Sequence, residues 1–133
     1  MPERKTVERA RKAKRQGKAP TTQAGEFIRE EIEHIREGKH GARSTQQAIA
    51  IGLSKARRAG VKLPPPKKGR ASAATRKRAA QDLRSAKSHR KPSAKRARAS
   101  LRRLKREPRS TVSKPALAAH ARKTARRRRS PAS

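Results

Sequence analysis

Lysine and arginine are the residues of this sequence whose number and spacing point to a specific chemistry. The chain of 133 residues holds 41 of them against 9 aspartates and glutamates, which gives a formal net charge of +32. Ammonium and guanidinium groups are strong donors to phosphate oxygens, and each phosphate contact on duplex DNA releases condensed counterions. This surplus of positive charge predicts binding to a polyanion, with an affinity that falls steeply as salt rises.

The cations concentrate in the C-terminal half of the sequence. Residues 64–133 hold 25 Lys and Arg with 2 acids, residues 21–63 hold 8 with 5, and residues 1–20 hold 8 with 2. We therefore expect nucleic acid to contact the basic residues of the last helix of the central segment and those of the C-terminal half: Lys55, Arg57, Arg58, Lys67, Lys68, Arg70, Arg76, Lys77, Arg78, Lys95, Arg96, Arg98, Arg102, Arg103, Lys105, Arg106, Arg122, Lys123, Arg126, Arg127, Arg128 and Arg129.

Duplex DNA is the expected partner, with little sequence preference. Phe27 is the single aromatic residue, so the chain lacks the stacking platforms that readers of unpaired bases use. We expect a nucleoid-associated protein that neutralises and bridges or compacts DNA. Two alternatives stay open: a ribosome- or RNA-associated basic protein, and an adaptor whose helical module docks on another protein while the basic segment localises it.

Other function classes find little support in the residues. There is no cysteine, and His34, His40, His89 and His120 lie far apart in the sequence, so no metal site is expected. No Gly-rich phosphate loop or catalytic constellation is apparent, so we expect no cofactor and no enzyme activity. No apolar run approaches the roughly 20 residues that span a bilayer, which predicts a soluble protein of the cytoplasm and nucleoid without a membrane partner.

The apolar residues predict a mostly α-helical fold with one small module. Nine of the 16 large apolar residues fall within residues 21–63, and three prolines, Pro64 to Pro66, follow them. We expect a basic arm at 1–20, a two-helix hairpin at 21–63, and a long, largely disordered basic tail at 64–133. The tail has helix-forming potential at about 73–89, 94–106 and 116–129, where folding is expected upon binding.

Capping signals place the two helices of the module. Thr22 is the expected start of the first helix, with Gly38 as its terminator. Ser44 begins the second helix, and Gly60 ends it in a left-handed conformation. Gly52, inside that helix, suggests that another backbone approaches closely there.

The module is expected to be too small to be stable by itself. Its nine large apolar side chains bury too little surface to offset the ordering of about 42 residues, so a homodimer through residues 21–63 is expected. Five glutamates, Glu26, Glu30, Glu31, Glu33 and Glu37, lie on the first helix. They form either a solvated face with Glu31 at its rim, or a stripe that pairs with cations of the second helix or of the tail.

Two parts of the sequence resemble known families. The stretch STQQAIAIGLSKARRAG at 44–60 resembles a recurring element of small basic bacterial proteins of unassigned function, which implies a bacterial origin and a compact helical module. The Ala-, Lys-, Arg-, Ser- and Pro-rich segment resembles the C-terminal arms of linker histones and of bacterial histone-H1-like proteins, which implies DNA compaction through charge. It is richer in Arg than in Lys, which favours bidentate phosphate contacts.

Ser130, after four arginines, is a candidate phosphorylation site, where modification would lower the positive charge of this segment.

Overall fold

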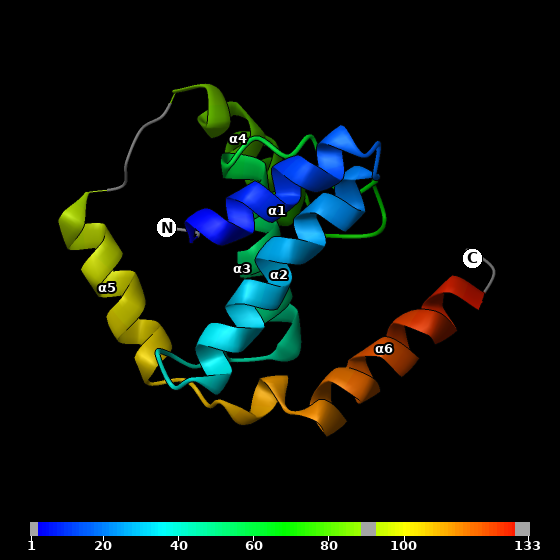
Figure 1. Ribbon diagram of the computed structural model, residues 1–133. Coiled ribbons are helices and arrows are strands. Elements are labelled where there is room, and N and C mark those ends of the chain that lie inside the picture. The colour runs from blue at the N-terminus through cyan, green and yellow to red at the C-terminus, as the bar shows by residue number, and fades with distance from the viewer. Residues whose placement is uncertain (1–2, 89–92, 130–133) are drawn as a thin grey trace.

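The computed structural model describes residues 3–88 and 93–129, and nearly all of this part is helical (Figure 1). No described helix is both long and apolar enough to cross a bilayer. In chain order the elements are α1 (Arg4–Arg15), α2 (Pro20–Arg36), α3 (Thr45–Arg58), α4 (Ala73–Ser88), α5 (Ala94–Lys105), the short 3-10 helix η1 (Ser110–Val112) and α6 (Lys114–Arg129).

The expected two-helix hairpin with a long disordered tail is wrong. The N-terminal arm contains α1, and the basic half contains α4, α5 and α6. Serine side chains cap two helices of the basic half: the hydroxyl of Ser72 before α4 accepts from the backbone N of Thr75 at 3.2 Å, and that of Ser93 before α5 accepts from Arg96 N at 3.2 Å. Alanine has the highest helix propensity, and together with these caps it outweighs the repulsion between neighbouring cations.

Helices α2 and α3 form the centre of the molecule, and their ends follow the expected signals. Gly38 and Gly60 have φ of 83° and 104°, as expected for helix terminators. After α3 the backbone N of Val61 donates to Ala56 O at 3.0 Å, and Val61 is buried. The start of α2 differs from expectation, because the helix begins at Pro20, whose fixed φ suits the first helical position.

The crossing of α2 and α3 depends on a small residue. A methyl group at Gly52 would lie 2.7 Å from Ile28 Cα, so the two backbones meet there. Ala48 and Ala56, one turn to either side, are fully buried. The expectation that Gly52 faces another backbone is confirmed.

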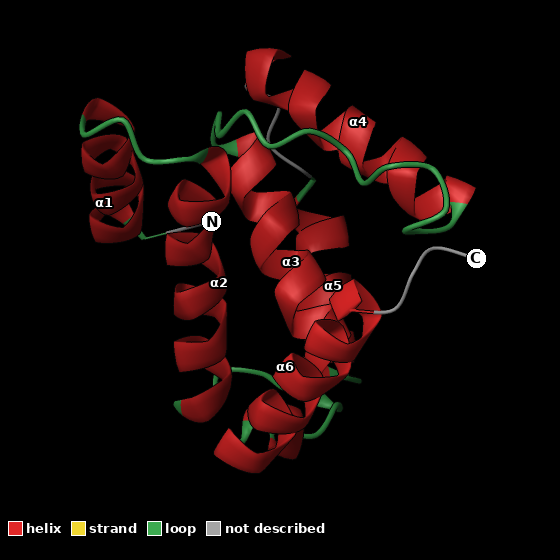
Figure 2. Cartoon of the chain, turned by 90° about the vertical axis from the view of Figure 1, so that its right-hand side faces the viewer, coloured by secondary structure: helices red, strands yellow, loops and turns green. Residues whose placement is uncertain are grey.

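A first apolar cluster joins α1 to the α2–α3 pair. Ala10 of α1 packs with Phe27 of α2, Ala56 of α3 and Leu63 of the following loop. Helix α1 therefore lies against α2, while α4 packs on α3 on the opposite side (Figure 2). The segment expected to be a basic arm packs on the fold because Thr6 and Ala10 are buried and Val7 contacts the first cluster.

A second apolar cluster depends on the C-terminal half. Val112 is fully buried against Ile35, Ala42 and Ala48. Hydrogen bonds hold this segment: the Arg109 guanidinium donates to Ile35 O at 3.1 Å, and Thr111 Oγ1 donates to Ala42 O at 3.0 Å. The chain itself thus covers the surface that a second copy was expected to cover. A second copy is therefore not needed to bury this surface, and the expected homodimer is not supported.

Substitutions of two glycines test the helix crossing. Gly52→Ala should lower the free energy of unfolding by about 1–3 kcal/mol, because the added methyl group meets the Ile28 backbone. Gly25→Ala, inside α2 with no atom within 4 Å of the added group, should raise it by about 0.5–1 kcal/mol. Urea denaturation of both variants measures the difference, and equal stabilities would contradict the close approach.

Candidate nucleic-acid interface

Helix α5 carries a set of exposed cations. Six of its twelve residues are exposed Lys or Arg, and within the described chain none of them forms an ion pair with a carboxylate: Lys95, Arg96, Arg98, Arg102, Arg103 and Lys105. Leu101 on the same helix is the exposed large apolar residue of the described chain, at 42%. The helix makes no packing contact with another described helix, so its cations face solvent.

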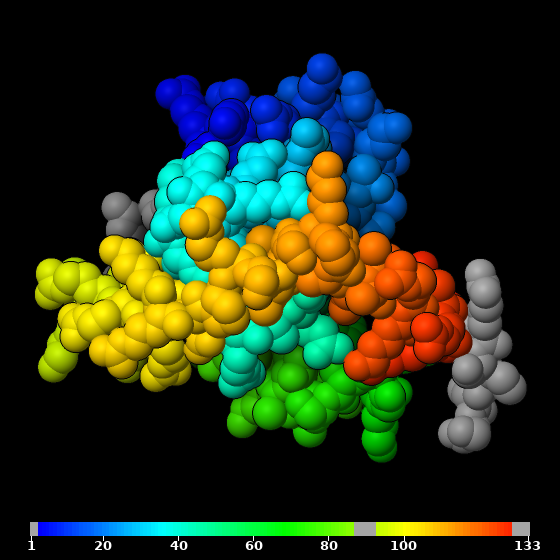
Figure 3. All heavy atoms as spheres, turned by 90° about the horizontal axis from the view of Figure 1, so that it is seen from below, coloured from blue at the N-terminus to red at the C-terminus, as the bar shows by residue number. Residues whose placement is uncertain are grey.

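Helix α6 extends the same face of the molecule. Seen from below, α5, the linking segment and α6 follow one another across one side (Figure 3). Residues 94–129 contain 15 Lys and Arg and a single acid, Glu107. Exposed side chains on this side include Arg106 after α5 and, on α6, Arg122, Lys123, Arg127 and Arg128. Arg126 is also exposed, and it interacts with another part of the chain. The side chain of Arg129 is outside the described residues. We call this side, formed by residues 94–129, the basic face.

The predicted residues of α4 and of the loop before it are mostly exposed. Lys67, Lys68 and Arg70 project from the loop, and Lys77 and Arg78 from α4. Arg76 differs, since its Nε donates to Pro66 O at 3.1 Å and fixes the loop against the helix. These side chains belong to a helix that packs on α3, whereas α5 is unattached to another helix.

The three predicted residues of α3 all bind partners in the chain, although the side chain of Arg58 is 57% exposed. Lys55 Nζ lies 2.5 Å from Glu31 Oε2, and Arg58 Nε lies 3.0 Å from Asp82 Oδ1. Arg57 is buried, and it donates to the carbonyls of Leu63 and Pro64. Burial lowers the pKa of Arg57, an effect that the nearby Asp82 charge opposes. These cations stabilise the fold, and the structure does not bring them to the basic face.

Asp82 is a structural residue that sequence reasoning missed. It is 5% exposed, and its carboxylate accepts from Ser54 Oγ at 2.8 Å and from Arg58 at 3.0 Å. Asp82 is one of only two acids in residues 64–133, and this rarity was the signal available in the sequence. Through it α4 is tied to α3.

The glutamates of α2 pair within the folded body. Glu31 is 1% exposed and lies 2.8 Å from His40 Nε2, so its expected place at the solvated rim is wrong. Its pairing with Lys55 matches the alternative that cations of the second helix meet the stripe. Within the described residues none of the glutamates of α2 pairs with a cation of residues 64–133: Glu26 faces Arg9, Glu30 faces His34, Glu33 faces Arg29 and Glu37 faces Lys39.

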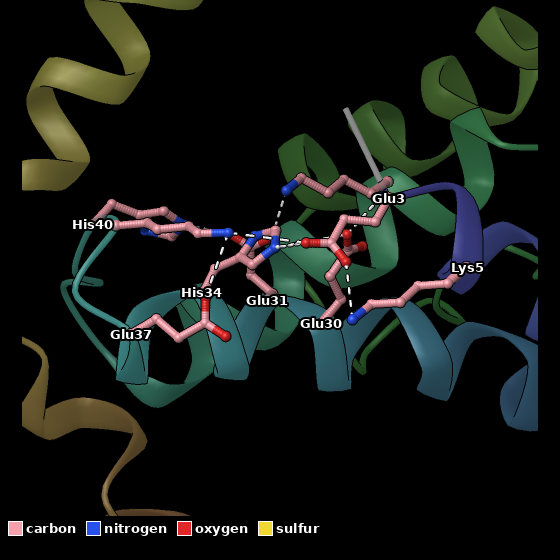
Figure 4. Close-up of polar contacts among 9 residues, drawn as sticks. Glu3, Lys5, Glu30, Glu31, His34, Glu37 and His40 are labelled. Carbon is pink, nitrogen blue, oxygen red and sulfur yellow. Dashed lines mark hydrogen bonds and ion pairs between the residues drawn. The ribbon is translucent and has the colours of Figure 1, made fainter.

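A separate polar cluster forms where α1 begins (Figure 4). His34 Nε2 lies 3.2 Å from Glu3 Oε1 and 3.7 Å from Glu30 Oε1, and the backbone N of Glu3 donates to Glu30 Oε1 at 2.5 Å. The hydrogen bond from His34 is the main cause that lowers the pKa of Glu3; partial burial opposes it, and the nearby Lys5 adds to it. Sequence reasoning found no acid at ligand spacing from a histidine, yet Glu30 and His34 are one helical turn apart.

Removing Asp82 should release α4. Asp82→Ala leaves Arg58 and Ser54 without their acceptor, and it should lower the free energy of unfolding by about 1–3 kcal/mol. Amide hydrogen exchange should show the largest loss of protection in α4. Glu33→Ala, which removes the exposed pair with Arg29, is the matched control and should change stability by less than about 0.5 kcal/mol. Equal losses in both variants would contradict the role of Asp82.

The lowered pKa of Glu3 gives a test by NMR. In His34→Ala the carboxyl of Glu3 should titrate at higher pH than in the unaltered protein, measured from its carbon chemical shift with a chelator present. Because the folded-state pKa is depressed, the contribution of Glu3 to stability is present above the ordinary glutamate pKa. It is lost as pH falls through the lowered value. An identical titration in both proteins would show that His34 does not act on Glu3.

Comparison with known protein families gives a match to the first half of the chain. Residues 3–68 match the model of a family described as a "Family of unknown function (DUF6496)". This agrees with the resemblance of residues 44–60 to small proteins of unassigned function, and the matched region includes α1, α2 and α3. No curated protein and no solved structure matches the chain. The basic face lies outside the matched residues.

Proposed function

We propose that this protein binds duplex DNA with little sequence preference through its basic face, and that it acts as a nucleoid-associated protein. The observation that carries the proposal is the contrast between two sets of cations. Those of α3 are bound by carboxylates or carbonyls of the chain, whereas those of α5 are exposed without a carboxylate partner in the described structure. Unpaired, solvated cations are available to phosphate without breaking an internal contact.

Binding through this face would gain its free energy from counterion release. A helix lays its exposed cations along a phosphate backbone, and each neutralised phosphate frees a condensed ion. The exposed guanidinium groups can donate two hydrogen bonds to one phosphate. No aromatic side chain is available to stack on bases, since Phe27 is fully buried in the first cluster. Such contacts position a protein on DNA and carry no base information.

The arrangement of the two outer helices supports bridging. Helices α5 and α6 extend from opposite sides of the same end of the body (Figure 1). The segment between them is anchored by Val112 and Arg109, so the two helices leave from a fixed base. One chain could thereby contact two backbone stretches, either within one bent duplex or on two duplexes.

Salt titration of binding to random-sequence duplex DNA tests the proposal. The triple variant Arg98→Gln, Arg102→Gln and Arg103→Gln removes three exposed charges from α5. If all three meet phosphates, the slope of log K against log salt should become less steep by about 2.7. Substitution is preferable to truncation, because deleting the basic half would remove buried Val112 and Asp82 and damage the fold.

A matched control removes the same charge elsewhere. Arg11→Gln, Lys12→Gln and Arg15→Gln alter three exposed cations of α1, and this variant should change the slope much less. Equal effects of the two variants would show diffuse attraction rather than an interface at the basic face. The same titration with structured RNA separates the alternative of an RNA-associated protein, which tighter binding to RNA at every salt concentration would favour.

A further inference from the structure

The cluster of Glu3, Glu30 and His34 has the composition and spacing of a metal site. One donor atom from each residue lies within 4.8 Å of the other two. His34 Nε2 is 3.2 Å from an oxygen of Glu3 and 3.7 Å from an oxygen of Glu30. Two ligands of a tetrahedral Zn²⁺ ion, each at about 2.0–2.1 Å from the metal, lie about 3.3 Å apart. The atoms therefore already have nearly the separation that a bound ion requires.

We propose that Glu3, Glu30 and His34 bind one divalent transition-metal ion, with Zn²⁺ as the best match. Imidazole nitrogen combined with two carboxylates suits Zn²⁺, whereas Mg²⁺ and Ca²⁺ prefer sites made of oxygen alone. A water molecule would complete four-coordination. This inference is independent of DNA binding and goes beyond the proposed function.

The burial of Glu30 supports a bound cation. Glu30 is 4% exposed, and its Oε2 is buried without a hydrogen-bond partner. A buried carboxylate oxygen without a partner is costly, and a cation bound by that carboxylate would offset the cost. Figure 4 shows the carboxylates of Glu30 and Glu3 side by side, next to the His34 ring.

The surroundings allow an ion to enter. The side chain of Glu3 is 37% exposed, so solvent reaches the cluster there. The open hollow of about 550 Å³ that His34 lines contains Lys39, Lys55 and Lys105 and neither glutamate, so it is not the route for a cation. Lys5 and Lys39 contact Glu3 at 3.4 and 3.9 Å, but both are more than half exposed and free to turn toward solvent. Although the chain is strongly basic as a whole, four of its nine acids, Glu3, Glu30, Glu31 and Glu37, gather around this point (Figure 4).

A metal ion here would fasten the start of α1 to α2. Glu3 is the residue before α1, and Glu30 and His34 belong to α2. Besides this cluster, α1 is held by buried Ala10 and Thr6 and by Val7, which packs against the first apolar cluster. Metal binding would therefore add a cross-link at the N-terminal end of α1, and it should raise the melting temperature.

Titration of the full chain with ZnCl₂, at constant ionic strength and without DNA, tests the site. Calorimetry should give one Zn²⁺ per chain, and the imidazole NMR signals of His34 should move while those of His40 and His120 stay in place. Glu30→Gln and His34→Gln should each weaken binding at least about tenfold. Glu33→Gln removes the same charge from the same helix outside the cluster, and it should bind Zn²⁺ unchanged.

Circular dichroism of each variant verifies that the helices are retained. If His34→Gln loses its fold, the Zn²⁺ affinities of Glu30→Gln and Glu3→Gln are compared with that of the unaltered protein instead. An amide keeps the shape of the carboxylate, so these variants should retain the fold. Equal Zn²⁺ affinity in all variants would overturn the proposal, as would movement of the His40 or His120 signals while His34 is unaffected.

Discussion

The scarcity of carboxylates is the constraint on which this structure depends. Nine acids face 41 cations, and a compact fold requires that the strongest repulsion be relieved where helices meet. The buried acids lie at such junctions: Glu31 between α2, α3 and the turn that joins them, Asp82 between α4 and α3, and Glu30 between α2 and the start of α1. Residues 94–129 contain a single acid, Glu107. The positive charge of the basic face therefore stays exposed, because most carboxylates lie elsewhere in the fold.

The central pair of helices could be predicted because its signals are local. Caps, terminating glycines and the small residue at position 52 each act within a few residues, and the structure shows Gly52 against Ile28 as expected. The packing of α1, α4 and the Val112 segment could not be predicted in this way. These parts pack through a few small or single apolar residues that lie far apart in the sequence. Their high mean charge and low mean hydropathy are typical of disordered segments, so the sequence predicts disorder there.

The same distinction applies to the functional residues. The many arginines of α5 and α6 indicated a nucleic-acid interface, because charged residues are usually exposed on the surface. The sequence could not show that Lys55, Arg57 and Arg58 bind other residues of the chain, since their partners Glu31, Leu63 and Asp82 depend on the tertiary fold. The spacing of Glu30 and His34 was visible in the sequence, whereas Glu3, 27 residues before Glu30, required the docking of α1.

The burial of Val112 also imposes an order on folding. The second apolar cluster contains residues of α2 and α3 that are synthesised well before Val112, and it cannot close until that residue arrives. The cations of α5 precede Val112 in the chain, so they are synthesised before this cluster can close. Until Val112 docks, Ile35 and Ala48 lack the residue that covers them in the folded protein. The second cluster therefore closes late in synthesis, whereas every residue of the first cluster lies before position 64.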